Sequence, residues 1–311
     1  MKVVVTGVSG KMGRIVAREL AGAGHRVVGI DVRPWPDPPP GIEVVLADIR
    51  KRPAEDVFRR ERPDALVHMA TVTYLTHGRE ARSRINLVGT QAVLEHAHTH
   101  GVGRVIFVGR HTYYGAAPDA PLYHTEEDPP LAVHTYPELA DLVAADLYAA
   151  SALWRHPEID TCILRIVYVL GPSGHGPLAS YLSARRVPTV LGYDPLFQVM
   201  HERDAARAVA SALEHGLRGV FNVSGPAPIP LSVLIEEAGR PAVPVPEPIL
   251  PRLLGRFGFS RLPRGAVVHL QHPVVVDGRR FRDATGFRYE YDLPETIAAF
   301  RGAFPPEGAA T

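Results

Sequence analysis

The chain has 311 residues, of which 46% are hydrophobic and 22% charged, which is enough for a buried core in one large domain or two interlocked ones. The net charge is only +1, and no basic block or stripe of basic and aromatic residues occurs, so neither nucleic acid nor a membrane surface is expected as a partner. Met1 leads almost directly into a strand-like run and no apolar run reaches the length of a membrane span, so we expect a cytoplasmic protein.

Short apolar runs alternate with helical patterns through the first half of the chain. The predicted strands span residues 2–7, 25–31, 43–48, 65–70, 104–109 and 161–169. Between the first two, residues 11–24 place Ile15, Val16 and Leu20 on one side at helical spacing. Nearly continuous apolar strands separated by helices indicate a parallel sheet covered on both faces, so the fold class is α/β and doubly wound. After residue 170 the alternation loosens, and residues 241–265 are rich in proline and glycine, which predicts a smaller second lobe.

A glycine-rich turn is the strongest chemical signal. Residues 6–13 read TGVSGKMG and place Gly7, Gly10 and Gly13 between the first strand and the first helix. These glycines allow a tight turn, close approach of backbone N–H groups to a pyrophosphate, and close packing of helix on strand. The second strand ends at Asp31, where an acid would accept the ribose 2′-hydroxyl of an adenine dinucleotide. The loop is therefore predicted to bind a dinucleotide through the glycines and through Ser9, Lys11 and Met12.

The acid at the end of the second strand favours NAD as the cofactor. Asp31 should repel a 2′-phosphate, whereas Arg33 lies close enough to keep NADP as an alternative. Asp48 and Ile49 follow the third strand, and we place them near the adenine. A solvated loop carboxylate is the alternative interpretation of Asp48.

On these motifs the chain resembles the extended short-chain dehydrogenase/reductase family, in its NAD-dependent epimerase/dehydratase branch. The resemblance runs almost end to end. The matching segments are TGVSGKMG (6–13), VHMAT (67–71), NLVGT (86–90), LRIVYVLGP (164–172), VMHERDAARAV (199–209), GVFNVSGP (219–226) and ATGFRYE (284–290).

The resemblance implies two lobes with a substrate cleft between them. A Rossmann domain would span residues 1–168 and be completed by about 199–224, and a smaller α/β substrate lobe would comprise 169–198 and 225–311. The cofactor would lie across the strand ends, in contact with Met69, Ala70, Thr71, Asn86 and Val108. The resemblance also implies a homodimer, built on helices at roughly 86–100 and 137–155.

The chain departs from the family pattern where the chemistry should be. Family members resemble one another in a Ser/Thr-x-x-x-Tyr-Gly segment and a Tyr-x-x-x-Lys segment. Alignment puts Arg110 at the hydroxyl position and Ala140 at the lysine position, so only Tyr136 of the trio remains. No lysine occurs after Lys51. We therefore expect Tyr136 to act as acid/base, and also to contact the cofactor, with the Arg110 guanidinium supplying the missing positive charge.

Other candidate catalytic and substrate residues follow from the same alignment. His111 and Thr112 fall where related dehydratases carry an acidic pair, and a neutral-pH imidazole suits proton transfer. The alternative for His111 is a loop histidine bonded to the backbone. Tyr168 and Phe197 replace an asparagine and an arginine that bind nucleotide sugars in relatives, which favours a smaller carbonyl or alcohol substrate; His201 is placed beside them.

No metal site is predicted. His96 and His100 have helical spacing, but a third ligand is not evident nearby, and Cys162 is the only cysteine.

Two functional classes remain open. We favour an NAD-dependent epimerase/dehydratase-like oxidoreductase acting on a small carbonyl, alcohol or sugar-like molecule. The alternative, suggested by the missing lysine, is a degenerate protein that binds a dinucleotide as a sensor or scaffold.

Overall fold

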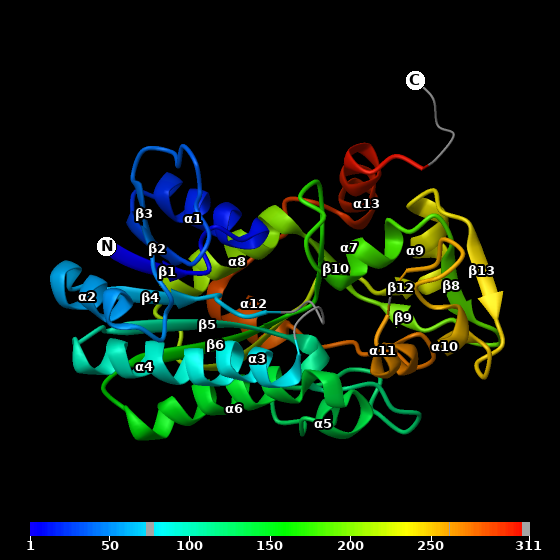
Figure 1. Ribbon diagram of the computed structural model, residues 1–311, viewed down its shortest axis with the longest axis horizontal. Helices are drawn as coiled ribbons and strands as arrows, with labels where there is room; N and C mark the ends of the chain where they lie inside the picture. The colour runs from blue at the N-terminus through cyan, green and yellow to red at the C-terminus, as the bar shows by residue number, and fades with distance from the viewer. Residues whose placement is uncertain (73–77, 261, 307–311) are drawn as a thin grey trace.

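A seven-stranded parallel sheet forms the larger lobe of the computed structural model, which describes residues 1–72, 78–260 and 262–306 (Figure 1). Its strands are β1 (Lys2–Thr6), β2 (Arg26–Asp31), β3 (Ile42–Leu46), β4 (Ala65–His68), β5 (Arg104–Arg110), β6 (Asp160–Ile166) and β11 (Gly219–Val223). Their order across the sheet is β11-β6-β5-β4-β1-β2-β3, and every pairing is parallel. The predicted α/β class, the doubly wound sheet and the predicted strands are confirmed.

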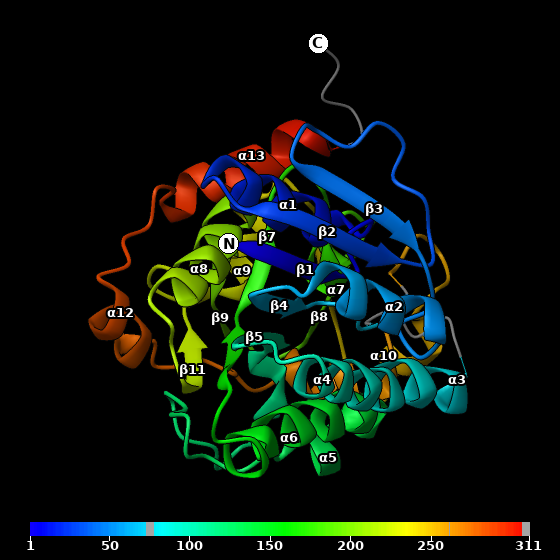
Figure 2. The same ribbon diagram turned by 90° about the vertical axis from the view of Figure 1, so that its left-hand side faces the viewer.

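Helices cover both faces of this sheet. The helices of the larger lobe are α1 (Lys11–Gly22), α2 (Arg52–Glu61), α3 (Arg79–Ser83), α4 (Gly89–Thr99), α5 (Ala132–Thr135), α6 (Ala140–Arg155), α8 (Glu202–Glu214) and α12 (Arg279–Thr285). Helices α1 and α8 pack together on one face, whereas α4 and α6 lie side by side on the other (Figure 2). Short turns of other helix types are η1 (Arg84–Val88), η2 (His111–Tyr113) and η3 (Pro137–Leu139). Each long helix turns an apolar face inward, as Met12, Val16 and Leu20 do in α1.

The smaller lobe consists of short strand pairs and helices. The pairs are β7 (Tyr168–Leu170) with β10 (Val199–His201), β8 (Val187–Val190) with β13 (Ala242–Val245), and β9 (Leu196–Phe197) with β12 (Ile229–Pro230). The helices are α7 (Gly176–Leu182), α9 (Leu231–Glu237), α10 (Leu250–Leu253), α11 (Arg264–His269) and α13 (Leu293–Ala303). These elements enclose an apolar core of their own, which includes Leu182, Val187, Leu234 and Phe300.

The C-terminal part of the chain returns to the larger lobe before it ends. Phe281 of α12 and Phe287 pack in the core beneath the large sheet, together with Phe221 of β11. Not all of the segment 225–311, which was predicted as substrate lobe, therefore belongs to the smaller core. Residues 307–311 of that segment lie outside the described residues.

The strand order places a ligand crevice at one position of the sheet. Strands β2 and β4 flank β1 on opposite sides, so the connections leave β1 and β4 in opposite directions. Open parallel sheets bind ligands outside the carboxyl ends of strands at such a switch point. Gly7 follows β1 and Met69 follows β4, and the two segments touch there. Within the described residues no helix is long and apolar enough to cross a membrane, and the location of the protein in the cell stays a prediction.

Close packing of α1 on β1 depends on a glycine, which gives a first prediction. A Cβ at Gly13 would lie 2.1 Å from the carbonyl oxygen of Gly7, whereas a Cβ at Gly22, in the same helix, would meet nothing within 4 Å. Gly13→Ala should therefore destabilise the protein by roughly 1–3 kcal/mol through overpacking. Gly22→Ala should stabilise it by roughly 0.4–1 kcal/mol, because alanine reduces the entropy of the unfolded chain. Urea unfolding of both variants tests this; equal stabilities would contradict the close approach.

Candidate active site

The glycine turn has the geometry of an anion-binding loop. Gly7 adopts a positive φ of 75°, and a Cβ there would lie 2.9 Å from the backbone nitrogen of Ala70. Gly10 is the N-cap of α1, and no side chain accepts a hydrogen bond from the first turn of that helix. The N–H groups at a helix N-terminus then remain available to a pyrophosphate.

Asp31 fixes this turn to the end of β2. Its carboxylate is buried and accepts hydrogen bonds from the backbone N–H groups of Ser9 and Arg33, each at 3.0 Å. The Ser9 hydroxyl donates to the carbonyl of Arg33 at 2.8 Å. The Arg33 guanidinium lies 3.3 Å from the Asp31 carboxylate, although most of its side chain is exposed. Asp31, which was predicted to select NAD, therefore also binds Arg33, the residue that led us to retain NADP as an alternative cofactor.

The other residues near this loop that were predicted to bind the cofactor make contacts within the protein. The Lys11 ammonium donates to the carbonyl of Gly174 in the second lobe at 2.9 Å, and Met12 is buried in the core. The Asp48 carboxylate accepts a hydrogen bond from the Arg50 guanidinium at 2.9 Å, which lowers the pKa of Asp48. Ile49 packs against α4 at Gly89.

Asn86 positions the chain that follows β4. It lies in the π-helical turn η1, a helix irregularity often found at functional sites. Its side-chain oxygen accepts from the N–H of Val72 at 2.7 Å, and its amide donates to the carbonyl of Val72 at 3.1 Å and to Asp141 at 2.6 Å. Asn86 is fully buried, so its amide fixes the adjacent Thr71 and does not reach open space itself.

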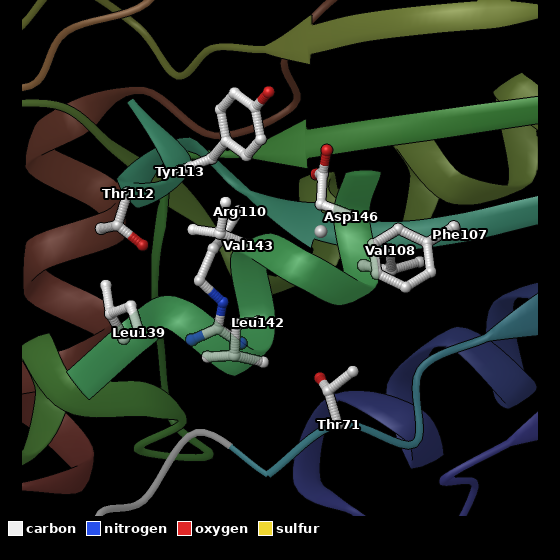
Figure 3. A pocket seen from close by; sticks show the side chains of 11 residues that line it. Thr71, Phe107, Val108, Arg110, Thr112, Tyr113, Leu139, Leu142, Val143 and Asp146 are labelled. Atoms are coloured by element: carbon white, nitrogen blue, oxygen red, sulfur yellow. The ribbon is translucent and has the colours of Figure 1, made fainter. Parts of the chain in front are cut away.

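Arg110 ends β5 and points away from the core. Figure 3 shows its guanidinium beside Leu142, on the side of Thr71, whereas Tyr113 and Asp146 point the other way. The space that these side chains line has a volume of about 10 Å³, room for roughly one water molecule. The guanidinium makes no hydrogen bond or ion pair with any residue that the structure describes. Burial lowers the pKa of Arg110, and the nearby Asp141 opposes that shift.

Tyr136 lies close to Arg110, and its hydroxyl has no hydrogen-bond partner among the described residues. Burial raises the pKa of Tyr136 well above its ordinary value, Tyr168 and Glu138 add to the shift, and Arg110 opposes it. Helix α11 packs directly on the ring, because a Cβ at Gly265 would lie 2.3 Å from Tyr136 Cδ2.

Two histidines complete the cluster around Tyr136. His111 donates from Nδ1 to the carbonyl of Ile166 at 3.2 Å, as the backbone-bonded alternative predicted, and its Nε2 has no partner within the described part of the chain. His269 of α11 lies with its ring 5.3 Å from that of Tyr136. Burial lowers the pKa of His111 to about 3 and that of His269 to about 4, so both imidazoles are neutral. His269 was not predicted, because it lies just after the proline- and glycine-rich segment 241–265 and belongs to no motif.

An aromatic wall stands next to this cluster. The Tyr168 ring meets His111 edge-on at 4.4 Å and stacks on Phe197 at 5.4 Å. The two aromatic residues are therefore in contact, and Phe197 is buried in the core of the smaller lobe; their place in a substrate cleft stays a prediction. His201 has other contacts: it caps α8 by accepting from the N–H of Arg203 at 3.2 Å, and it stacks on Tyr291 at 3.7 Å. A substrate contact of His201 stays a prediction.

Several polar groups at this place have no hydrogen bond to a described residue. Buried polar groups in folded proteins almost always have hydrogen-bond partners, so exceptions call for an explanation such as a ligand or catalysis. Here they are the Arg110 guanidinium, the Tyr136 and Tyr168 hydroxyls, Thr112 Oγ1, His111 Nε2 and His269 Nε2; elsewhere among the described residues the same holds for His25 Nε2, Arg82 Nε, His96 Nε2, His100 Nε2, His124 Nε2 and Ser260 Oγ. The groups at this place come from the ends of β5, β7 and α11 and from the turn before α6.

The fold defines a Rossmann-type protein with a glycine-rich loop after its first strand. The chain belongs to the NAD dependent epimerase/dehydratase family, whose sequence pattern matches residues 3–224. The predicted family resemblance is thereby confirmed, and NAD is the cofactor in the family's description, as predicted.

Known proteins agree with this assignment. An uncharacterized protein of Mycobacterium tuberculosis is 29% identical over 272 residues, which cover 86% of this chain and 72% of that protein. A UDP-glucose 4-epimerase of Thermus thermophilus, solved with NAD, superposes with a TM-score of 0.76 at 22% identity, with 100% of both chains covered. A dTDP-glucose 4,6-dehydratase of Streptomyces venezuelae, also solved with NAD, gives 0.75 at 22% identity, with 97% of each chain covered. At these identities the solved structures show the shared fold.

The contacts of Asp31 predict a cofactor preference. NAD(H) should bind more tightly than NADP(H) by roughly 1.5–3 kcal/mol, the usual strength of a hydrogen bond to a charged group, because Asp31 accepts ribose hydroxyls and repels a phosphate. Asp31→Ser should weaken NAD binding and free the Arg33 guanidinium, which moves the preference toward NADP(H). The matched control is Asp48→Ser, at the end of the next strand, which should leave the preference unchanged. Calorimetry measures the affinities of all three proteins for both cofactors; tighter NADP(H) binding by the unaltered protein would refute the assignment.

Proposed function

We propose that the protein is an NAD(H)-dependent oxidoreductase of the epimerase/dehydratase type that acts on a small carbonyl or alcohol group. The observation that carries the proposal is the cluster of unpartnered polar groups beside the dinucleotide loop. Such a cluster suits a substrate whose oxygen changes charge during the reaction. When bound, NAD would accept or donate the hydride.

Arg110 would bind the reacting oxygen. Its guanidinium has no acceptor among the described residues, and Thr71, in the segment that Asn86 fixes beside the dinucleotide loop, lines the same space. A preorganised donor aimed at a developing oxyanion stabilises it most where water is excluded. Arg110 stands where relatives carry a hydroxyl residue, so a charged donor would replace a neutral one.

Tyr136 would move the proton. Because its pKa lies above the ordinary value, the hydroxyl carries its proton at neutral pH and is ready to donate it to a carbonyl oxygen. In the opposite direction Tyr136 must first lose that proton, so alcohol oxidation requires alkaline conditions. His111 Nε2 and the neutral His269 would accept hydrogen bonds from substrate hydroxyls.

The substrate would lack a nucleotide diphosphate. Tyr168 and Phe197 form a stacked aromatic pair at the positions where nucleotide-sugar relatives were expected to carry asparagine and arginine. An aromatic ring does not neutralise a diphosphate. A small carbonyl, an alcohol or a free sugar-like molecule fits this wall better than a UDP- or dTDP-sugar.

One observation favours the alternative of a dinucleotide sensor or scaffold. Ala140 replaces the lysine, and burial raises the pKa of Tyr136, the opposite of what an acid/base tyrosine needs for deprotonation near neutral pH. The kinetic experiment below separates the two functions, because a sensor would bind NAD without turning over a substrate.

The raised pKa predicts a distinctive pH profile. In the direction of alcohol oxidation, kcat should rise with pH through the alkaline range, since the reactive phenolate grows tenfold per pH unit below the pKa of Tyr136. Tyr136→Phe should lower kcat by about 100-fold or more and remove the rise. Arg110→Met should lower kcat by a comparable factor, roughly 100-fold. The measurement is steady-state turnover across pH, with substrates from a carbonyl and alcohol panel and absorbance of reduced nicotinamide as readout.

A matched variant controls for nonspecific effects. Tyr123→Phe makes the same chemical change on an exposed loop residue and should keep the activity of the unaltered protein. Full activity in Tyr136→Phe would exclude that tyrosine as the catalyst. Tight NAD binding with no turnover of any substrate in the panel would favour the sensor or scaffold.

We also propose a homodimer through α4 and α6. Leu147 and Trp154 are 46% and 85% exposed, and their spacing of seven residues puts them on one face of α6. Val88, at the start of α4, is 44% exposed. Exposed apolar surface of this kind marks interaction sites.

Introduction of negative charge into this apolar face tests the dimer. Trp154→Glu combined with Leu147→Glu should convert the dimer to a monomer, because each carboxylate would be buried without a partner. Leu122→Glu, at an equally exposed leucine on a distant loop, should leave the assembly unchanged. Light scattering coupled to size exclusion measures the mass; a monomeric unaltered protein would contradict the proposal.

A further inference from the structure

Two histidines and a glutamate converge on the surface where α4 and α6 end. His98 lies in the last turn of α4, and His156 and Glu158 lie in the turn after α6. The Nδ1 atoms of His98 and His156 are 3.1 and 3.5 Å from the same oxygen, Glu158 Oε1. One ligand atom from each residue lies within 4.8 Å of the others, and the two imidazole rings are 3.9 Å apart.

These separations match the edges of a small metal coordination sphere. Zinc binds imidazole nitrogen and carboxylate oxygen at about 2.0–2.2 Å in tetrahedral geometry, so neighbouring donor atoms lie roughly 3.3 Å apart. We propose that His98, His156 and Glu158 bind a zinc-class transition-metal ion, with the fourth position open to water. Magnesium and calcium are poor candidates, because they prefer all-oxygen ligands.

The turn that carries His156 and Glu158 is held in place without a metal. The Arg218 guanidinium donates to the carbonyls of Leu153 and Pro157, which flank His156. On the other side of Glu158, the N–H of Asp160 donates to the carbonyl of Gly103 at 3.0 Å. A preorganised turn of this kind loses little entropy on binding, so two fixed ligands meet His98 at low conformational cost.

The histidine-rich segment thus contributes a different residue from the pair considered in the sequence. His96 packs its ring 5.8 Å from that of Phe58, and His100 lies 3.6 Å from Glu55, both toward α2. Only His98 faces α6. No third ligand was evident in the sequence near His96 and His100. In the structure, the partners of His98 come from a distant part of the chain, since His98 and Glu158 are 60 positions apart.

The side chains of His98 and Glu158 are 43% and 56% exposed, so an ion can enter directly from solvent. Once bound, the metal would join the ends of α4 and α6 by coordinate bonds in place of the hydrogen bond between His98 and Glu158 and the ion pair of Glu158 with His156. Because it binds the folded chain, it would raise stability by mass action. The site lies outside the cluster around Tyr136 and is independent of the proposed function.

Metal titration of the full chain tests the proposal. After EDTA treatment and its removal, zinc should bind at one ion per chain by calorimetry and raise the melting midpoint. His98→Ala and Glu158→Gln should each weaken binding by at least the roughly 10-fold that loss of an outer hydrogen-bond partner costs a zinc site. His100→Ala, in the same helix turn, should bind zinc as the unaltered protein does. Cobalt(II) should give the intense visible absorption of tetrahedral coordination.

Three outcomes would overturn the site. The first is an absence of zinc binding by the unaltered protein at about 100 μM, an affinity weaker than about 5.5 kcal/mol. The second is an equal loss of affinity in His100→Ala, which would point to other ligands. The third is the weak absorption of octahedral cobalt, which would contradict a tetrahedral arrangement.

Discussion

The Arg110 guanidinium, which makes no hydrogen bond or ion pair with a described residue, is the constraint on which the proposed site depends. A buried positive charge is costly unless a counter-charge or hydrogen bonds compensate it, and no described residue fully compensates Arg110. The groups around it are neutral or protonated: burial lowers the pKa of His111 and His269 and raises that of Tyr136. Asp141 partly offsets the charge of Arg110, and its Oδ2 also accepts from Asn86. An electron-rich substrate oxygen would supply the hydrogen-bond acceptor that Arg110 lacks in the proposed site.

The position of this charge explains why the pKa of Tyr136 is raised, whereas the lysine of the family pattern would lower it. A lysine at position 140 would come from α6, one turn after Tyr136, whereas Arg110 approaches from the end of β5. Arg82, the other cation that lowers the pKa of Tyr136, donates to the carbonyl of Glu138 at 2.8 Å and lies 3.7 Å from Asp141, so part of its charge is already compensated. Because neither Arg110 nor Arg82 stands where that lysine would, burial remains the dominant effect on the pKa of Tyr136.

The sequence predicted what depends on local pattern, and it missed what depends on distant neighbours. The glycine turn, Asp31 and the strands were predictable, because turn geometry and burial on both faces each leave a signature within a few residues. His269 has no such signature, because helix α11 is short and only begins where the proline- and glycine-rich segment 241–265 ends. The same holds for the group of His98, His156 and Glu158, which the side-by-side packing of α4 and α6 brings together at their C-terminal ends. The predicted Tyr136 and Arg110 are close in space, because the ends of β5 and the turn before α6 meet at the same edge of the sheet.

The second lobe takes part in the proposed site through its backbone as well as through the side chains of Tyr168, Phe197 and His269. Gly265 packs on the Tyr136 ring, where any side chain would displace one of the two elements. On the opposite side, the Lys11 ammonium bonds to the carbonyl of Gly174, and the adjacent His175 has its pKa lowered to about 4 by burial, with Arg110 and Lys11 adding to the effect. The segment at 174–175 thus lies near both Lys11 and Arg110. Because one short segment is close to both cations, a change in its position would alter the surroundings of Lys11 and of Arg110 together.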